Sequence, residues 1–123
     1  MPVDRKAMIQ DYKRTARPMG VGAVRNTATG KMLLAATRDL PAFLNRHRAQ
    51  LRLNAHPNRA LQADWTDLGP DLFEFVVLDT LAPRDAPDYD PTEDLVTLEQ
   101  LWLEKLNPFE PAGYHRHKPG AAV

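Results

Sequence analysis

The chain has 123 residues, of which 43% are hydrophobic, and this length and composition fit one domain with a single core. It contains no cysteine, which excludes disulfides and thiolate zinc sites. Neither an apolar run long enough to span a bilayer nor a secretory leader is visible, so a cytoplasmic protein without a membrane partner is expected.

Positive and negative charges are separated along the sequence, although the formal net charge is zero. Residues 1–59 carry a balance of +9 and residues 60–123 a balance of −9. The basic half could be an electrostatic footprint for phosphates. Equally, the two halves could simply attract each other across the fold. Charge alone leaves both interpretations open.

The first predicted element is a helical extension over residues 1–17. Asp4 can cap a helix over residues 3–15, in which Ala7, Met8 and Tyr12 fall on one face. Pro18 ends this extension, because the residue before a proline avoids the helical conformation.

Three segments are predicted to be strands. Residues 19–25 and 31–37 flank a short polar loop with a glycine near its end, which is typical of a β-hairpin. Residues 72–79 are rich in aromatic and β-branched residues and form the third strand. Strands joined by a tight loop are antiparallel, and the third must pair with one of them.

Three further helices are predicted. One spans residues 40–52 and has a shared apolar face formed by Leu40, Phe43, Leu44, His47 and Leu51. A short helix follows, with Leu61, Trp65 and Leu68 as its stripe. The last begins after an acidic, proline-rich loop at residues 82–91, is capped by Asp90, and runs to Leu106. Residues 116–123 lack apolar periodicity and are predicted to be a flexible tail.

This order predicts an α+β fold, a small three-stranded antiparallel sheet flanked by helices. Gly20-Val21-Gly22 lies on the first predicted strand, and the stretch from Gly30 to Ala35 leads into the second. Further short motifs follow along the chain: Arg46-His47, His56-Pro57-Asn58, Leu61-Gln62, Trp65, Gly69, Phe73, Glu99, Trp102, Leu106-Asn107 and Gly113-Tyr114-His115. In this order and at these spacings the residues resemble GIY-YIG nucleases, which carry the two motifs of their name where the first two stretches stand. The resemblance implies a GIY-YIG-like domain over residues 18–115, with Gly22 and Leu33 on neighbouring antiparallel strands.

The resemblance also implies a chemistry that this chain has mostly lost. In the family, one tyrosine acts as the general base or beside it. A second tyrosine and an arginine stabilise the phosphoryl transition state, and a glutamate holds a divalent cation. By position, the tyrosines correspond to Gly22 and Leu33, the arginine to Phe43 and a closing asparagine to His115, so only Glu99 keeps its type. Losing one such donor typically costs about a hundredfold in rate. The chain is therefore interpreted as a pseudo-nuclease with no intact catalytic residue.

Glu99 is predicted to lie inside the apolar arc of the last helix, where a carboxylate needs a partner. The resemblance implies a ligand for Mg²⁺ or Mn²⁺ at this position. The alternative partner is an arginine from the basic half, or the indole of Trp65 or Trp102. Because a single carboxylate makes a weak magnesium site, no cofactor is expected, and a metal at Glu99 stays an alternative.

Basic and histidine side chains are the candidates for contact with nucleic acid: Arg38, Arg46, His47, Arg48, Arg52, His56 and Arg59. Arg48 and Arg52 are helix neighbours and are expected to avoid the apolar stripe, so both a solvated face and a phosphate-binding surface are open. His47 is either a packing residue or a phosphate ligand. His56 is either a loop anchor or a site residue.

Three hypotheses for function follow. The favoured one is a catalytically defective GIY-YIG-like domain that binds nucleic acid weakly and without sequence preference, or that keeps only a protein-binding role. The second is an active metal-dependent endonuclease whose site has moved to Arg46 or Arg48, His47, His56 and Glu99. The third is a module that self-associates through its acidic and basic halves.

Overall fold

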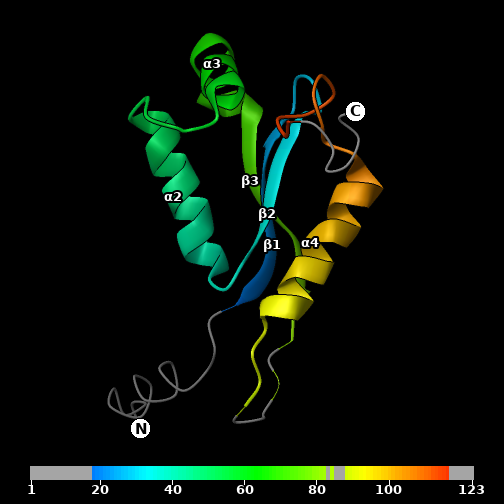
Figure 1. Cartoon of the computed structure of the whole chain (residues 1–123). Coiled ribbons are helices and arrows are strands. Elements are labelled where there is room, and N and C mark those ends of the chain that lie inside the picture. Colours follow the sequence, from blue (N-terminus) through cyan, green and yellow to red (C-terminus); the bar gives the residue numbers. More distant parts are fainter. Residues whose placement is uncertain (1–17, 83, 85–87, 117–123) are drawn as a thin grey trace, which may run out of the picture.

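The computed structural model describes residues 18–82, 84 and 88–116, and Figure 1 shows a central sheet with helices on both sides. The strands are β1 (Met19–Asn26), β2 (Met32–Thr37) and β3 (Phe73–Leu81). The helices are α2 (Leu40–Arg52), α3 (Arg59–Leu68) and α4 (Thr92–Leu106), with a 3₁₀ turn, η1 (Pro70–Leu72), before β3. The helix predicted over residues 3–15 lies outside the described residues, as does the predicted tail beyond Arg116.

The sheet confirms the predicted α+β class. Its strand order is β2-β1-β3, and both neighbouring pairs are antiparallel. Gly22 on β1 faces Ala35 on β2, and Val24 faces Leu33, so Gly22 and Leu33 lie on neighbouring antiparallel strands as expected. Because cross-strand partners point to the same face, both residues lie on one side of the sheet.

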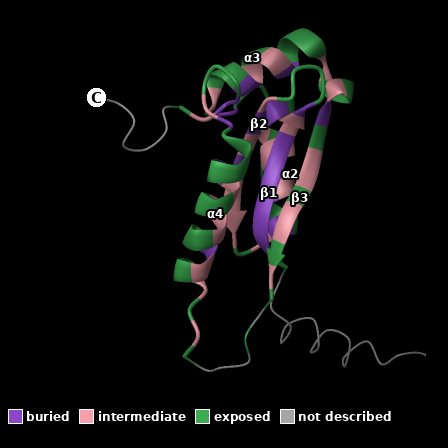
Figure 2. Ribbon diagram, turned by 90° about the vertical axis from the view of Figure 1, so that its right-hand side faces the viewer, coloured by how far each residue is buried: buried purple, intermediate pink, exposed green. Residues whose placement is uncertain are grey.

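The central strand β1 is buried on both faces, and this divides the core into two layers (Figure 2). Val21 and Ala23 pack with Leu103 of α4 on one face. Val24 packs with residues of α2, α3 and the C-terminal segment on the other: Leu51, Leu61, Trp65 and Tyr114. A strand covered on both faces loses the alternation of apolar and polar residues, which explains the unbroken apolar sequence of β1.

Side chains at the helix starts fix where the helices begin. Asp39 accepts a hydrogen bond from the Ala42 amide at α2, and Asn58 accepts one from the Leu61 amide at α3. The predicted start of the last helix is wrong by one residue, because Pro91 precedes its first turn rather than joining it. Asp90 nevertheless binds the Thr92 amide at 3.0 Å. Among the described residues, no helix is long and apolar enough to cross a membrane.

Ion pairs connect the basic half of the chain with the acidic half. Arg25 pairs with Glu74 across β1 and β3, and Arg38 reaches Asp90 at 2.8 Å. All four side chains are at least 40% exposed, and exposed pairs contribute about 0–1 kcal/mol each. Attraction between the halves therefore operates within one molecule, and it is weak.

Candidate nucleic-acid interface

The positions assigned to the first tyrosine and the arginine are in contact, and they leave no room for a side chain at Gly22. Phe43 is 3% exposed on α2 and its ring lies against β1. A Cβ atom at Gly22 would lie 2.7 Å from Cδ1 of Phe43 and 2.8 Å from its Cε1. Such distances are far inside van der Waals contact, so the Phe43 ring excludes every larger residue from position 22.

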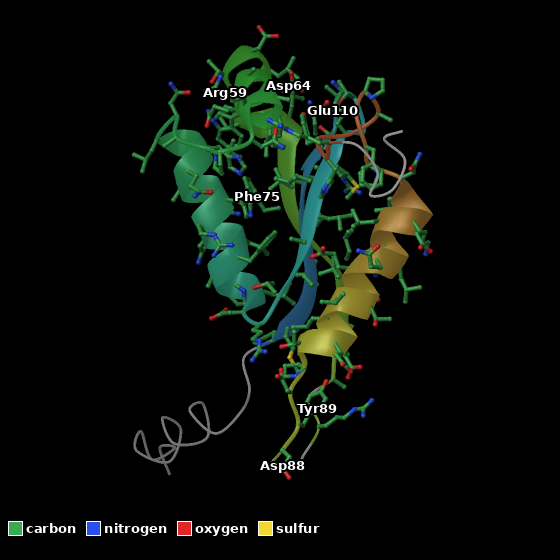
Figure 3. All side chains as sticks on the ribbon, in the orientation of Figure 1. Arg59, Asp64, Phe75, Asp88, Tyr89 and Glu110 are labelled. Atoms are coloured by element: carbon green, nitrogen blue, oxygen red, sulfur yellow. The ribbon has the colours of Figure 1, made fainter. Side chains whose placement is uncertain are left out.

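A pocket of about 560 Å³ opens beside Leu33, the position assigned to the second tyrosine. Its polar lining comes from α2, the loop before α3, the start of α3 and the C-terminal segment: His47, His56, Asn58, Arg59, Glu110 and Arg116. Figure 3 shows Arg59 and Glu110 at the same end of the molecule, opposite the acidic loop that carries Asp88. The pocket therefore combines two guanidinium groups and two imidazoles with one carboxylate.

His47 and His56 form a hydrogen-bonded pair in this pocket. The Asn58 amide donates to His56 Nδ1 at 3.0 Å, so this nitrogen carries no proton. His56 therefore carries its proton on Nε2 and donates it to His47 Nδ1, 2.8 Å away. Neutral His47 in turn keeps its proton on Nε2. The prediction left both histidines between packing and site roles, and the structure places them together at one pocket.

Burial keeps both imidazoles neutral. It lowers the pKa of His47 to about 4, with further contributions from the nearby His56 and Arg46. Burial also lowers the pKa of His56. It lowers the pKa of His115 in the same way, against the opposing effect of the Glu99 carboxylate. At neutral pH these side chains are polar hydrogen-bonding groups without charge.

These lowered pKa values predict that the folded protein loses stability in mild acid. Below pH 6.5 the unfolded chain binds protons at these histidines, whereas the folded chain takes up the same protons only at lower pH, in the case of His47 near pH 4, so the free energy of unfolding decreases as the pH falls. We expect the melting temperature to fall by about 5 °C or more between pH 7 and pH 4.5. Thermal unfolding followed by circular dichroism measures it. In a His47→Gln, His56→Gln variant the decline should be smaller, and an unchanged decline would contradict this origin.

The predicted arginine surface is divided by the structure. Arg46 and Arg48 lie about 200° apart around α2, on opposite flanks of its apolar face. The Arg48 guanidinium lies 4.7 Å from the ring centre of Phe75 on β3, so Arg48 is off the apolar stripe of its own helix but contacts an aromatic ring of the sheet. Arg46 is exposed and close enough to His47 to lower its pKa. Arg46 on α2 and Arg59 at the start of α3 therefore lie toward the pocket, whereas Arg48 and its helix neighbour Arg52 lie on the β3 side of α2.

Arg38 lies apart from the other candidates. It precedes α2, whereas His56 and Arg59 follow the opposite end of that helix. Its guanidinium binds Asp90 and the Thr92 hydroxyl at the start of α4. The structure thus gives Arg38 a partner within the fold and removes it from the pocket.

Glu99 and His115, the other two positions carried over from the resemblance, meet the outer edge of β2. Glu99 Oε2 accepts a hydrogen bond from the Ala36 amide at 2.8 Å, and His115 Nε2 accepts one from the Leu34 amide at 2.9 Å. Among the described residues, the hydrogen bond of Glu99 is to this main-chain amide and to neither an arginine nor an indole, and the Trp102 indole donates to Asp79. The partner of Glu99 is the main chain of a strand.

Sequence reasoning missed a buried polar cluster around Tyr114, which is 1% exposed. The Tyr114 hydroxyl accepts from Asn26 Nδ2 at 2.9 Å and donates to Asp64 Oδ2 at 2.7 Å. Burial raises the pKa of this hydroxyl. The Tyr114 carbonyl also accepts from Asn58 Nδ2, and this bond holds the loop that carries His56. The cluster positions the pocket wall, and its only sequence signal was the Gly-Tyr-His match.

Comparison with protein-family profiles finds no match to this chain, and none is found among curated proteins. Among solved structures, the catalytic domain of the homing endonuclease I-TevI matches with a TM-score of 0.66 and 21% identity. The match covers 81% of this chain and 99% of that domain. The chain has the GIY-YIG nuclease fold. A glutamate-to-alanine mutant of the same catalytic domain matches with a TM-score of 0.59 and 20% identity, over 73% of this chain and 84% of the other.

On this fold, the three positions that the resemblance assigned to the tyrosines and the arginine form one apolar layer between the sheet and α2. Gly22 and Leu33 point to the α2 side, and Phe43 packs from α2 onto Gly22. Leu33 packs against the cluster that contains Val24 and Tyr114. The layer offers no hydroxyl or guanidinium at these three positions.

Proposed function

We propose that this GIY-YIG-like domain is catalytically defective and binds nucleic acid weakly and without sequence preference. The observation that carries the proposal is the contact between Phe43 and Gly22. It fills with hydrocarbon the space where the resemblance requires a tyrosine and an arginine. Phosphoryl transfer needs positive charge and donors placed on the reacting oxygens, and neither glycine nor phenylalanine supplies them.

The remaining polar groups support a defect in catalysis. A general base works best when its pKa is near the working pH, whereas the pKa of His47 is about 4. His47 Nδ1 is also occupied by the hydrogen bond from His56. This pair can donate a hydrogen bond to a phosphate oxygen, but it is a poor proton acceptor at neutral pH.

The donor set does not fit a catalytic metal ion. Mg²⁺ and Mn²⁺ prefer several oxygen ligands, and Glu99 has one carboxylate oxygen engaged by the Ala36 amide. Among the described residues, no three histidine, aspartate or glutamate side chains come together to hold a metal. We therefore derive no catalytic step through Mg²⁺ or Mn²⁺.

Binding of nucleic acid is proposed for the pocket side of α2. Arg59 and Arg116 line the pocket, and Arg46 lies beside His47 on the same flank. Guanidinium groups suit phosphate oxygens because they donate two parallel hydrogen bonds. Binding of the phosphate backbone needs only such a positively charged surface, without a code for the bases.

We expect no nicking of supercoiled plasmid by this protein above background in Mg²⁺ or Mn²⁺. The physical reason is the combined loss of three transition-state and proton-transfer groups at Gly22, Leu33 and Phe43, where each alone costs about a hundredfold or more. Gel electrophoresis of plasmid over a day, with a Glu99→Ala variant as the matched control, measures it. Robust cleavage that disappears in Glu99→Ala would establish the rearranged nuclease instead.

A further inference from the structure

The strand β2 lies at one edge of the sheet, so half of its main-chain groups point away from β1. The Met32 carbonyl and the amides of Leu34 and Ala36 make hydrogen bonds to residues outside the sheet, so the groups of the residues between them, Leu33 and Ala35, point inward to β1. Since main-chain groups alternate in direction along a strand, those of residues 32, 34 and 36 point outward. Exposed outward groups are a template for pairing with another chain.

Three of the outward groups of β2 form hydrogen bonds with α4 and with the segment that follows it. The Met32 carbonyl accepts from the Tyr114 amide at 3.1 Å. The Leu34 amide donates to His115, and the Ala36 amide donates to Glu99. Three consecutive outward positions thus have partners from a part of the chain more than sixty residues away.

The geometry at the C-terminal side keeps these acceptors in place. A Cβ atom at Gly113 would lie 2.1 Å from the Pro108 carbonyl oxygen, so only glycine allows the chain to turn tightly there. The His115 amide then binds the Pro108 carbonyl, and the Glu110 amide binds the His115 carbonyl. This closed turn presents the His115 ring to β2, while Leu103 fixes α4 in the core.

We propose that Glu99 and His115 form an edge cap, two acceptor side chains that saturate the outward amides of β2 and prevent the strand from pairing with another chain. The cap consists of Glu99 on Ala36 and His115 on Leu34. A carboxylate accepts a stronger hydrogen bond from an amide than a neutral carbonyl does. A main-chain carbonyl of an incoming strand would therefore bind the Ala36 amide more weakly than Glu99 does. The cap also explains why the donor set at Glu99 does not suit a metal. It stands independently of nucleic-acid binding.

Amide hydrogen exchange measured by NMR tests the cap in the unmodified protein first. The Ala36 and Leu34 amides should exchange at least about tenfold more slowly than amides of an unpaired edge, because exchange requires their hydrogen bonds to open. Exchange of either amide at the rate of an unstructured chain would overturn the proposal without recourse to any variant.

Matched substitutions separate an acceptor role from a charge or metal role. Glu99→Gln and His115→Gln each keep an uncharged acceptor of similar reach, an amide oxygen in place of the carboxylate oxygen or the ring nitrogen, whereas Glu99→Ala and His115→Ala remove the acceptor. We expect Ala36 exchange to rise about tenfold in Glu99→Ala and less than about threefold in Glu99→Gln. If glutamine behaves like alanine at position 99, the acceptor role is wrong. Selective broadening of the Ala36 amide by Mn²⁺ that vanishes in Glu99→Gln would likewise overturn it, in favour of a metal ligand.

Removal of both acceptors should change the state of association. Sedimentation velocity over a hundredfold range of concentration should show a monomer for the unmodified protein and for the double glutamine variant. The double alanine variant should self-associate as concentration rises. If it stays folded and monomeric throughout, or if the unmodified protein already dimerises through β2, the cap does not control pairing. If the double alanine variant fails to fold, the exchange rate of the Ala36 amide in Glu99→Gln still decides whether Glu99 acts as an acceptor.

Discussion

Replacing Gly22 with alanine will lower the free energy of unfolding by about 1–3 kcal/mol, although alanine adds only a methyl group. The methyl group would meet two carbon atoms of the Phe43 ring at 2.7 and 2.8 Å. Phe43 is 3% exposed, and Leu40 also lies 3.4 Å from the added methyl group, so the ring cannot move aside without disturbing close-packed neighbours. Urea denaturation of both proteins, analysed with one m value for the dependence of the free energy of unfolding on urea concentration, measures the loss.

A double-mutant cycle with Phe43→Ala identifies the cause. The single Phe43→Ala change should cost about 3–5 kcal/mol, because it leaves a cavity in the core. In the double variant the methyl group at position 22 occupies part of that cavity, so the combined loss should be smaller than the sum of the two. Losses that add within about 0.5 kcal/mol would mean that the contact does not determine the effect.

Charge reversal on the pocket side of α2 should abolish measurable binding to DNA at physiological salt. With Arg46→Glu and Arg59→Glu, affinity at low salt should fall by about tenfold or more, and the slope of log affinity against log salt should decrease by about two. Both side chains are exposed, so the fold should be retained. Fluorescence anisotropy with a labelled duplex of mixed sequence, repeated at several salt concentrations, provides the measurement.

A matched control has the same change in net charge at a different place. Arg52→Glu and Arg84→Glu also replace two exposed arginines, but neither lines the pocket. Arg48 is unsuitable because it packs against Phe75. We expect the control to lower affinity only slightly, because it changes the net charge and so the long-range electrostatic attraction between the protein and DNA. Equal losses in both variants would assign binding to overall charge and reject the pocket side.

Within the described residues, the sequence predicted the helices and strands in their correct order, because each had a local signal. The polar loop ending in Gly30 marked the hairpin, and the apolar stripe of α2 marked both its ends correctly. The strand β3 extends to Leu81, beyond the predicted end, because pairing with Met19 on β1 prolongs it. Pairing of this kind is a tertiary effect that local propensity does not contain.

The candidate site was harder to predict than the fold. Helical spacing placed Glu99 toward the protein but could not supply its partner, because Ala36 offers a main-chain amide and no side-chain signal. For the same reason nothing in the sequence separates Arg48 from Arg46; the difference arises where β3 runs beneath α2. The Asn26–Tyr114 bond joins residues far apart in the chain. Such contacts depend on the closed fold, whereas periodicity reports only neighbours along one element.

Because Phe43 and Gly22 are in contact, the substitutions that one position tolerates depend on the residue at the other. Tyrosine cannot enter position 22 while the phenylalanine ring occupies its space, and removing that ring first leaves a cavity that costs stability. Every single-step route from this chain toward a tyrosine and arginine pair therefore passes through a less stable protein. Among relatives that share this packing, the two positions should covary, with aromatic residues at 43 accompanied by glycine at 22.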